Sequence, residues 1–439
     1  MKERTKLDRQ VWLAIIILGL VGQLAWMVEN FYFNTFLVKE IGGTTKDIRN
    51  MVALSGIVAT VTTIFMGAWS DKLKKRKIFI SLGYIIWGIV TLSFAFISKE
   101  SLETILPSSS PATVISVGVS LVIILDCIMT FFGSTANDAA FNAWITETTD
   151  ETNRGSVEGV LGALPLLAML LITGLGAIAI DLLGYGVFFG IIGLMVILCG
   201  VGGMFLIKEE AHPTKDQTRY FQKVIYGFRP STVKANKKLY LTFLAQCFFS
   251  ISFQVFMTYI LIYFEHNLGY GMIEYGLMLT VMIIASSVLG IILGRSVDRK
   301  GKAGFGLVGF GMYVSSLFLL ALSRNYFVLM AIGTILLTGD ILLVTVLSAK
   351  IRDETPKNSV GLFQGVRLFF VVLIPMVIGP TLGEWSIRSS TVTFLNEFGE
   401  TVLVPNTGIF WMAGLAGLLV VIPFLLVFKP MSQPTVETK

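Results

Sequence analysis

Twelve long apolar segments, separated by short polar ones, constrain this chain more than any other feature of its sequence. Each segment exceeds the roughly 17 residues that a helix needs to cross a bilayer, and none alternates apolar and polar residues as a barrel strand does. The sequence therefore predicts an all-α integral membrane protein with twelve transmembrane helices. The predicted spans are residues 11–36, 48–70, 78–98, 113–146, 156–182, 185–207, 239–264, 272–294, 304–323, 326–349, 358–383 and 409–428.

The composition supports this class of protein and excludes others. Hydrophobic residues make up 54% of the 439 residues and charged residues only 14%, whereas a soluble domain carries about 25% charged residues. Cys127, Cys199 and Cys247 all lie within apolar segments, which argues against disulfides and against a cysteine metal motif. The sequence contains neither a His-Glu-x-x-His motif nor a phosphate-binding Gly-Lys-Ser/Thr loop. We therefore expect no enzymatic activity, no cofactor and no bound metal ion.

The basic residues predict how the chain is oriented. An even number of spans places both termini on one side of the membrane, and most of the 34 Lys and Arg residues fall on that same side. Cytoplasmic loops are enriched in Lys and Arg. The sequence thus predicts a multi-pass protein of the cell membrane, plasma or inner, with both termini in the cytoplasm. The net charge of +6 reflects this bias, and no nucleic-acid partner is expected.

The longest polar segment divides the spans into two sets of six. We predict an N-terminal six-helix bundle at 1–207, a cytoplasmic linker at 208–238 and a C-terminal six-helix bundle at 239–439. The loop 150–157 before the fifth span matches the loop 353–360 before the eleventh span. Two parallel repeats of six helices are the predicted architecture, a design in which transporters open a central site to each side in turn.

A second pair of loops carries a family resemblance. The loops after the second and eighth spans resemble the signature Gly-x-x-x-Asp-(Arg/Lys)-x-Gly-(Arg/Lys)-(Arg/Lys) of the major facilitator superfamily. The twelve-span layout extends this resemblance over the whole chain. It implies that these loops, with Arg154 nearby, dock on helix starts of the opposite half and control opening. The residues implied in gating are Gly67, Asp71, Lys75, Arg76, Arg154, Gly294, Asp298, Arg299, Gly301 and Lys302.

A narrower resemblance concerns one branch of that superfamily. The segment from Gly22 to Trp26, the pair Leu125-Asp126 and the loop from Asp150 to Ser156 are similar to pieces of glycoside-pentoside-hexuronide:cation symporters and of the related sucrose:proton carriers. This resemblance implies a sugar or glycoside as the solute and a proton or sodium ion as the coupling cation.

Five ionisable residues lie within predicted spans, where each costs about 2.5 to 3.5 kcal/mol to insert. They are Glu29, Asp126, Asp138, Asp340 and Arg367. Four acids and one base leave carboxyl groups for a proton or sodium ion to neutralise, so all five are candidates for cation coupling. Asp340 and Arg367 are both roughly 14 Å from the cytoplasmic end and can meet. Two alternatives stay open, a static ion pair for these two residues and a headgroup contact for Glu29.

Neutral polar side chains predict where the solute binds. Four of them lie within about 80° of one another on the first span, and three follow at four-residue spacing on the seventh. Amides donate and accept hydrogen bonds and an indole ring stacks on a sugar, so the set suits a neutral, hydroxyl-rich ligand. The alternative is hydrogen bonding between helices without a ligand. The predicted substrate-binding residues are Gln23, Trp26, Asn30, Asn34, Asn142, Gln246, Ser250, Gln254 and Gln364.

These observations favour a secondary active transporter that moves a small polar solute together with H⁺ or Na⁺. An exporter of drugs or metabolites with the same fold is the alternative within transport. A membrane sensor or scaffold that does not transport is the alternative from another class. We expect a monomer whose partners are the solute, the coupling cation and the lipid bilayer.

Overall fold

The computed structural model describes residues 7–73, 75–149, 153–208, 227–300, 302–356, 360–396, 398–399 and 401–428. Within these residues, eleven helices are long and apolar enough to cross a membrane. One of them, Gly159–Leu206, has 48 residues and is interrupted at Gly184, whose φ is +78°. The interruption separates the predicted spans 156–182 and 185–207. The twelve predicted transmembrane helices are thereby confirmed, and the chain is a multi-pass membrane protein.

The N-terminal half contains the first six spans. Its elements are α1 (Arg9–Val28), η1 (Glu29–Phe33), α2 (Asn34–Lys39), α3 (Thr45–Leu73), α4 (Arg76–Ser93), η2 (Phe94–Phe96), α5 (Lys99–Ile105), α6 (Pro111–Gly133), η3 (Ser134–Phe141), α7 (Asn142–Thr148), α8 (Arg154–Leu171), η4 (Ile172–Gly176) and α9 (Ala177–Leu206).

The C-terminal half contains the other six spans and a small β-hairpin. Its elements are α11 (Pro230–Ala235), α12 (Lys237–Met257), α13 (Ile260–Ile262), η5 (Tyr263–Asn267), α14 (Met272–Lys300), α15 (Lys302–Leu320), α16 (Tyr326–Glu354), α17 (Val360–Leu368), η7 (Phe369–Leu373), α18 (Ile374–Ile387), β1 (Thr393–Leu395), β2 (Thr401–Leu403), α19 (Gly408–Leu418) and α20 (Val421–Phe428).

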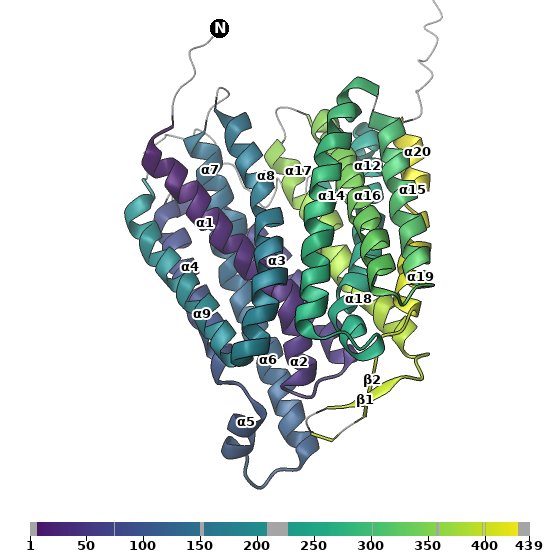
Figure 1. The fold of residues 1–439 in the computed structure, drawn as a ribbon. Helices are drawn as coiled ribbons and strands as arrows, with labels where there is room; N and C mark the ends of the chain where they lie inside the picture. Colours follow the sequence, from purple (N-terminus) through teal and green to yellow (C-terminus); the bar gives the residue numbers. More distant parts are fainter. Residues whose placement is uncertain are drawn as a thin grey trace, which may run out of the picture.

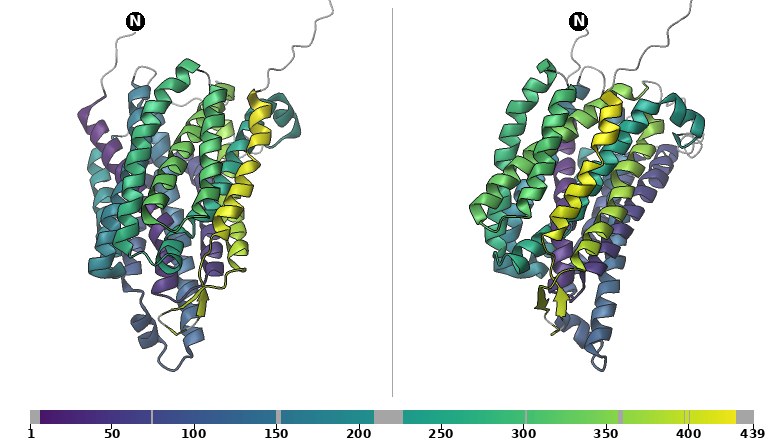
Figure 2. Two further views of the ribbon diagram at one scale, coloured as in Figure 1. Left: turned by 45° about the vertical axis from the view of Figure 1, so that its right-hand side comes forward. Right: turned by 90° about the vertical axis from the view of Figure 1, so that its right-hand side faces the viewer.

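The two halves lie side by side, with α1 to α9 on one side of the molecule and α12 to α20 on the other (Figure 1). The start of α1 and the end of α20 lie at the same end of the bundle, which we call the terminal end. The strands β1 and β2 and the short helix α5 project at the opposite end, which we call the hairpin end (Figure 2). This arrangement agrees with an even number of membrane crossings.

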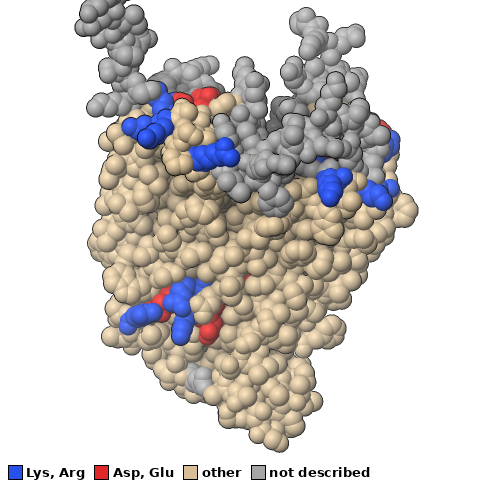
Figure 3. All heavy atoms as spheres, turned by 180° about the vertical axis from the view of Figure 1, so that it is seen from behind, with Lys and Arg blue, Asp and Glu red and all other residues tan. Residues whose placement is uncertain are grey.

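The surface shows the band expected of a membrane protein. On the face seen in Figure 3, Lys, Arg, Asp and Glu side chains occur at two levels, one near the terminal end and one nearer the hairpin end. Between these levels the surface consists of uncharged residues. Ionisable side chains are costly in the hydrocarbon core, so a band of this kind marks the part that lipid covers.

Within the described residues, five π-helical segments interrupt the transmembrane helices. Two pairs occupy corresponding spans of the repeats, η1 and η5 in the first and seventh, and η4 and η7 in the fifth and eleventh. The remaining segment, η3, lies in the fourth span. A π turn inserts an extra residue into the helix and is frequent at functional sites. It also rotates the side chains that follow it relative to those before it.

Polar contacts fix the start of the first span. The side chain of Asp8 accepts a hydrogen bond from the backbone N–H of Gln10 and caps α1. Lys208, which follows α9, donates to Asp8 Oδ2 at 2.5 Å. This hydrogen bond from Lys208, followed by the one from Gln10, lowers the pKa of Asp8 below its ordinary value. The first and sixth spans are thus joined at the terminal end.

Small residues let helices pack closely within the halves. α4 and α9 cross at Gly88 and Gly193, where a Cβ on Gly88 would approach the carbonyl oxygen of Gly193 to 2.6 Å. Close backbone approach through small residues is a usual basis of helix packing in membranes. At this crossing the two glycines allow the backbones of α4 and α9 to approach closely.

Candidate functional site

A cavity of about 210 Å³ lies between the two halves. The N-terminal half contributes residues of α1, η1, α2, α3, α6 and α8, and the C-terminal half contributes residues of α12 and α18, with Thr258 just beyond α12. A cavity enclosed by both repeats is where transporters of this architecture bind their solutes. The lining residues are Met27, Glu29, Asn30, Phe31, Asn34, Met51, Val52, Ser55, Asp126, Met169, Phe253, Gln254, Met257, Thr258 and Met376.

The π turn η1 brings polar residues of the first span into this cavity. Glu29, Asn30 and Asn34 all line it, and Glu29 and Asn30 are the first two residues of η1. Asn30 Nδ2 donates to the carbonyl oxygen of Trp26 at 2.7 Å. Because a π turn leaves helical hydrogen bonding locally irregular, it allows polar groups to be presented at this point of the span.

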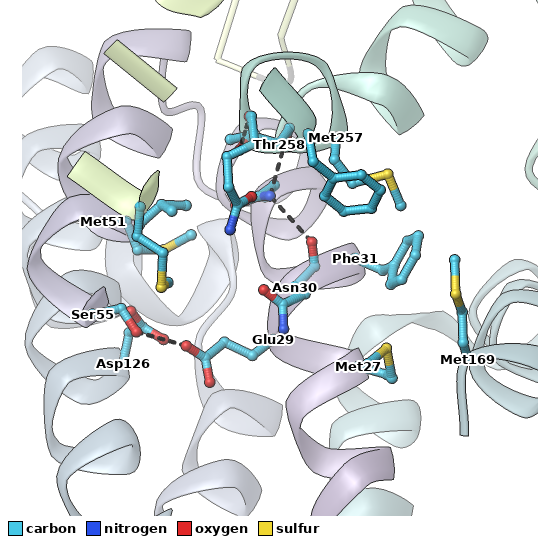
Figure 4. A pocket seen from close by; sticks show the side chains of 15 residues that line it. Met27, Glu29, Asn30, Phe31, Met51, Ser55, Asp126, Met169, Met257 and Thr258 are labelled. Carbon is cyan, nitrogen blue, oxygen red and sulfur yellow. Dashed lines mark hydrogen bonds between the residues drawn. The ribbon is translucent and has the colours of Figure 1, made fainter. Parts of the chain in front are cut away.

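Two carboxyl groups and two hydroxyl groups form what we call the carboxyl cluster: Glu29, Ser55, Asp126 and Thr130. Ser55 Oγ donates to Glu29 Oε1 at 2.6 Å and lies 2.8 Å from Thr130 Oγ1. Thr130 Oγ1 also lies 3.4 Å from Glu29 Oε1. Figure 4 shows the Glu29 side chain pointing toward Ser55 and Asp126. The cluster joins η1, α3 and α6 within the N-terminal half.

The cluster has unused hydrogen-bonding capacity. Asp126 is only 1% exposed, and it lies close enough to Glu29 for the two carboxyl groups to interact electrostatically. Glu29 Oε2 and Asp126 Oδ1 are buried and have no hydrogen-bond partner. No Lys, Arg or His is among the residues that line the cavity. Two acids without a base in the lining favour the uptake of a cation, because an isolated buried charge is costly.

Amide and hydroxyl groups continue the polar surface of the cavity toward the C-terminal half. Asn34 Nδ2 donates to the carbonyl oxygen of Thr258 at 3.0 Å, a bond that joins the two halves. Asn34 Oδ1 is buried without a partner. Gln254 and Thr258 line the cavity one helical turn apart. These groups are available for hydrogen bonds to a bound solute.

The rest of the lining is apolar and rich in sulfur. Five methionines and two phenylalanines surround the polar groups. Methionine side chains are flexible and polarizable, so they adapt to ligands of different outline. The cavity therefore presents a polar part and an adaptable apolar part. The apolar residues are Met27, Met51, Met169, Met257, Met376, Phe31, Phe253 and Val52.

Several predicted substrate-binding residues lie outside the cavity lining. Trp26 packs on Trp87 with ring centroids 4.8 Å apart, and Gln23 is on the same helix without reaching the lining. Asn142 Nδ2 donates to the carbonyl oxygens of Asn137 and Asp138 at 3.2 and 3.1 Å. The single polar stripe predicted for the first span is therefore divided, because η1 changes the helical phase that the prediction assumed constant.

The seventh span shows a similar division. Gln254 lines the cavity, whereas Ser250 and Gln246, one and two turns earlier, do not. Gln246 is buried, with its Oε1 atom unpartnered. The side chain of Gln364 lies outside the described residues. Of the predicted substrate-binding residues, the structure brings Asn30, Asn34 and Gln254 together at the cavity.

The other predicted charges are separated from the cavity. Asp138 lies in η3 and interacts electrostatically with Glu29, but it does not line the cavity. Asp340 lies on α16 beside Tyr313 of α15. Arg367 is exposed on α17, which packs against α3. The pairing of Asp340 with Arg367 therefore stays a prediction.

The signature loops are described only in part. Arg76 is buried, and its guanidinium contacts Glu147 Oε1 at 2.7 Å and Ser70 Oγ at 2.6 Å. These contacts join α4 to α7 and α3 within one half. Gly67 lies in α3, and Lys75 is exposed before α4. Gly301 and the side chains of Asp71, Arg154, Asp298, Arg299 and Lys302 are outside the described residues, as is the surrounding of Gly294, so their gating role stays a prediction.

Sequence reasoning missed Ser55, Thr130, Thr258 and the methionines. One signal was present for Thr258, which continues the four-residue spacing of Ser250 and Gln254. Hydroxyl residues and methionines occur throughout the spans, and only the three-dimensional arrangement distinguishes those at the cavity.

Comparisons with known proteins agree with this architecture. A family model described as Major Facilitator Superfamily matches residues 13–380 and also 242–439. The fold is similar to the crystal structure of nucleoside transporter NupG, with 12% sequence identity and a TM-score of 0.69 over 96% of this chain and 99% of that one. No curated protein sequence matches the chain.

It is also similar to a bacterial homologue of the human lysosomal transporter Spinster. The inward-facing, unoccupied structure of that protein has 13% identity and a TM-score of 0.64 over 96% of this chain and 97% of that one. The inward-facing, occupied structure gives 13% identity and a TM-score of 0.66 over 95% of each chain. At these identities the structural likeness establishes the fold and leaves the solute to be argued from the cavity.

Proposed function

The chain belongs to the major facilitator superfamily and is a transporter rather than an enzyme, and on this premise we propose that it moves a small polar solute together with H⁺ or Na⁺. The observation that carries the proposal is the carboxyl cluster at the wall of a cavity between the two halves. The halves, proposed to be residues 1–207 and 239–439 with a linker at 208–238, would open the cavity to each side in turn.

Cation coupling is supported by the chemistry of the cluster. Glu29 and Asp126 each have a buried oxygen without a hydrogen-bond partner, and the hydroxyls of Ser55 and Thr130 add two further oxygens nearby. Oxygen atoms are the ligands that hard cations prefer, and a carboxyl group that is short of partners also binds a proton. Both ions fit this description, so the experiment must separate them.

The solute that the cavity suits is a sugar or glycoside. Hydroxyl groups can bond to the amides of Asn30, Asn34 and Gln254, and an apolar ring or aglycone can lie against the methionines. The absence of Lys, Arg and His from the lining disfavours an anion. A nucleoside, which the structurally similar NupG is named for, likewise joins a sugar to a ring. We propose that the chain belongs to the branch of glycoside-pentoside-hexuronide:cation symporters or of sucrose:proton carriers, which the sequence resemblance from Gly22 to Trp26 and at Leu125-Asp126 supports.

The methionines favour a second candidate function, export of amphipathic drugs or metabolites. Five of the lining residues are methionines, and such surfaces accept varied apolar ligands. A cationic amphiphile would also be attracted to Glu29 and Asp126. Uptake and efflux therefore need to be measured separately.

Orientation and assembly complete the proposal. We place the terminal end in the cytoplasm of a plasma or inner membrane, because most of the 34 Lys and Arg residues fall on that side of the predicted spans. The transporting unit is a monomer, since the cavity is enclosed by the two halves of one chain. Impermeant labelling of a cysteine placed at Ser108, an exposed residue of the loop between α5 and α6, tests the orientation. Labelling only from inside the cell would contradict it.

The decisive experiment uses purified protein in two stages. Thermal unfolding in detergent is first measured with sugars, glycosides, nucleosides and cationic drugs, each with and without Na⁺. Solutes that stabilise the protein are then tested in proteoliposomes under a pH or Na⁺ gradient, with a protonophore or a sodium ionophore to collapse it. We expect a glycoside to accumulate against its gradient. A cationic drug as the only substrate would favour the exporter, and stabilisation without movement of any solute would favour a sensor.

A further inference from the structure

A β-hairpin at the hairpin end connects α18 to α19. β1 and β2 pair antiparallel, with Phe394 opposite Val402. An isolated two-stranded hairpin is only marginally stable, so packing against the rest of the protein must hold it in place. Val402 is 3% exposed and Val404 is fully buried, which shows that one side of the hairpin is covered.

The hairpin is anchored to the C-terminal half. The ring of His266, in η5, stacks on Phe394 with centroids 3.9 Å apart and an angle of 11° between the planes. Asn267 Nδ2 donates to the carbonyl oxygen of Pro405 at 3.0 Å. These contacts fix the hairpin to the end of the seventh span.

From this anchor the hairpin reaches across to the N-terminal half. Asn396 Nδ2 donates to the carbonyl oxygen of Gly42 at 3.2 Å. The Phe398 ring lies against Gly42, where a Cβ would come within 2.7 Å of it, and Lys99 Nζ lies 4.9 Å from the ring centre. Asn396 Oδ1 accepts from the backbone N–H of Phe398 at 3.0 Å. One short segment thus makes a hydrogen bond, a close packing contact and a cation–π contact with the opposite half.

Two ion pairs join the halves at the same end. Lys39 Nζ lies 2.5 Å from Glu265 Oε1, and Arg49 Nη1 lies 3.3 Å from Glu384 Oε2. Glu384 is also held by Arg388, whose Nε lies 2.9 Å from Oε1. Glu265 immediately precedes the His266 that stacks on the hairpin. The hairpin and the ion pairs therefore close the same boundary between the halves.

We propose that the described hairpin residues, above all Asn396 and Phe398, form a strap that holds the cavity closed at the hairpin end and leaves Gly42 and Lys99 when that end opens. The proposal rests on transport by alternate opening of the two ends. Its contacts with the N-terminal half exist only while the halves are together, so they bias the protein toward the state closed at this end. The anchor on His266 and Asn267 keeps the strap with the C-terminal half when the halves separate.

The test measures access to the cavity and needs neither a substrate nor a coupling ion, so its outcome is separate from that of the proposed function. Val52, which lines the cavity, is replaced by cysteine in a protein whose Cys127, Cys199 and Cys247 are replaced by alanine. A Leu395→Cys protein, labelled with an impermeant thiol reagent in intact cells and inverted vesicles, identifies the side on which the hairpin lies. The reagent is then applied to the Val52→Cys protein from that side.

We expect Phe398→Ala to raise the initial labelling rate of the cysteine at position 52 roughly threefold or more, because it removes contacts made only in the closed state. Asn396→Ala should act in the same direction by a smaller factor, and it serves as the test if Phe398→Ala is not recovered folded. Leu395→Ala is the matched control, since Leu395 is 70% exposed on the same hairpin. Equal labelling rates in the Phe398→Ala, Asn396→Ala and Leu395→Ala proteins would overturn the proposal.

Discussion

The two halves of the chain share an architecture but contribute different chemistry to the cavity. The N-terminal half supplies both carboxyl groups of the lining, Glu29 and Asp126, whereas the lining residues of the C-terminal half are uncharged. Those residues are Phe253, Gln254, Met257, Thr258 and Met376. Under the proposed function, this difference assigns the cation to the N-terminal half and the solute to both halves.

The π turns η1 and η5 show how this difference arises on repeat-related helices. Glu29, the first residue of η1, points into the carboxyl cluster. Glu265, the third residue of η5, is instead paired with Lys39 at the hairpin end. A π turn thus places one acid at the cavity in the first span and another at the boundary between the halves in the seventh.

The largest effect is expected from Asp126→Asn. The amide has nearly the shape of the carboxyl group but neither binds a proton in this pH range nor carries the charge that attracts Na⁺. Accumulation of the solute against its gradient should therefore be abolished, while exchange of labelled for unlabelled solute across the membrane should persist. Both are measured in proteoliposomes. Full accumulation by the variant would show that the cation binds elsewhere and would remove the asymmetry between the halves.

A change on the other side of the cavity should alter solute binding and leave coupling intact. Gln254→Ala removes one or two hydrogen bonds worth about 1 kcal/mol each, so the half-saturating solute concentration should rise roughly five- to tenfold or more. The ratio of cation to solute transported should not change. Gln246→Ala, two turns earlier on α12 and outside the lining, is the control. Equal effects of the two substitutions would contradict the assignment of Gln254.

A smaller effect is expected from Ser55→Ala. It removes the hydrogen bond of 2.6 Å to Glu29 Oε1, but Thr130 remains 3.4 Å from the same oxygen. Because Thr130 partly replaces the lost hydrogen bond, the free energy of cation binding should weaken by about 0.5–1 kcal/mol. The cation concentration that half-saturates transport should then rise roughly threefold. Ser250→Ala, outside the lining, should leave that concentration unchanged. A shift in solute affinity alone would place Ser55 in the solute site.

The sequence predicts the fold well because bilayer thickness imposes a length on every apolar segment. It also singles out Glu29 and Asp126, since acids within spans are rare and costly. It could not show that Trp26 lies outside the cavity lining, because the π turn η1 leaves no recognisable pattern in the sequence and alters the helical phase. The hairpin was missed for a related reason: its strands are three residues long and are held by contacts remote in sequence.

The smallest effect is expected from Asp340→Asn, which tests the comparison between the halves at an acid of the C-terminal half. Asp340 is an acid within a span of the C-terminal half, yet it lies on α16 beside Tyr313 and does not line the cavity. The hydroxyl of Tyr313, on α15, lies 3.1 Å from Ser252 Oγ on α12. Polar contacts between helices therefore explain the polar residues in this part of the C-terminal half.

If the cation binds only in the N-terminal half, Asp340→Asn should leave the transported cation-to-solute ratio unchanged and shift the thermal unfolding temperature by only a few degrees. Both are measured on the same preparations as Asp126→Asn. A loss of accumulation by Asp340→Asn equal to that of Asp126→Asn, with the protein still folded, would show that the second repeat has kept a coupling site of its own.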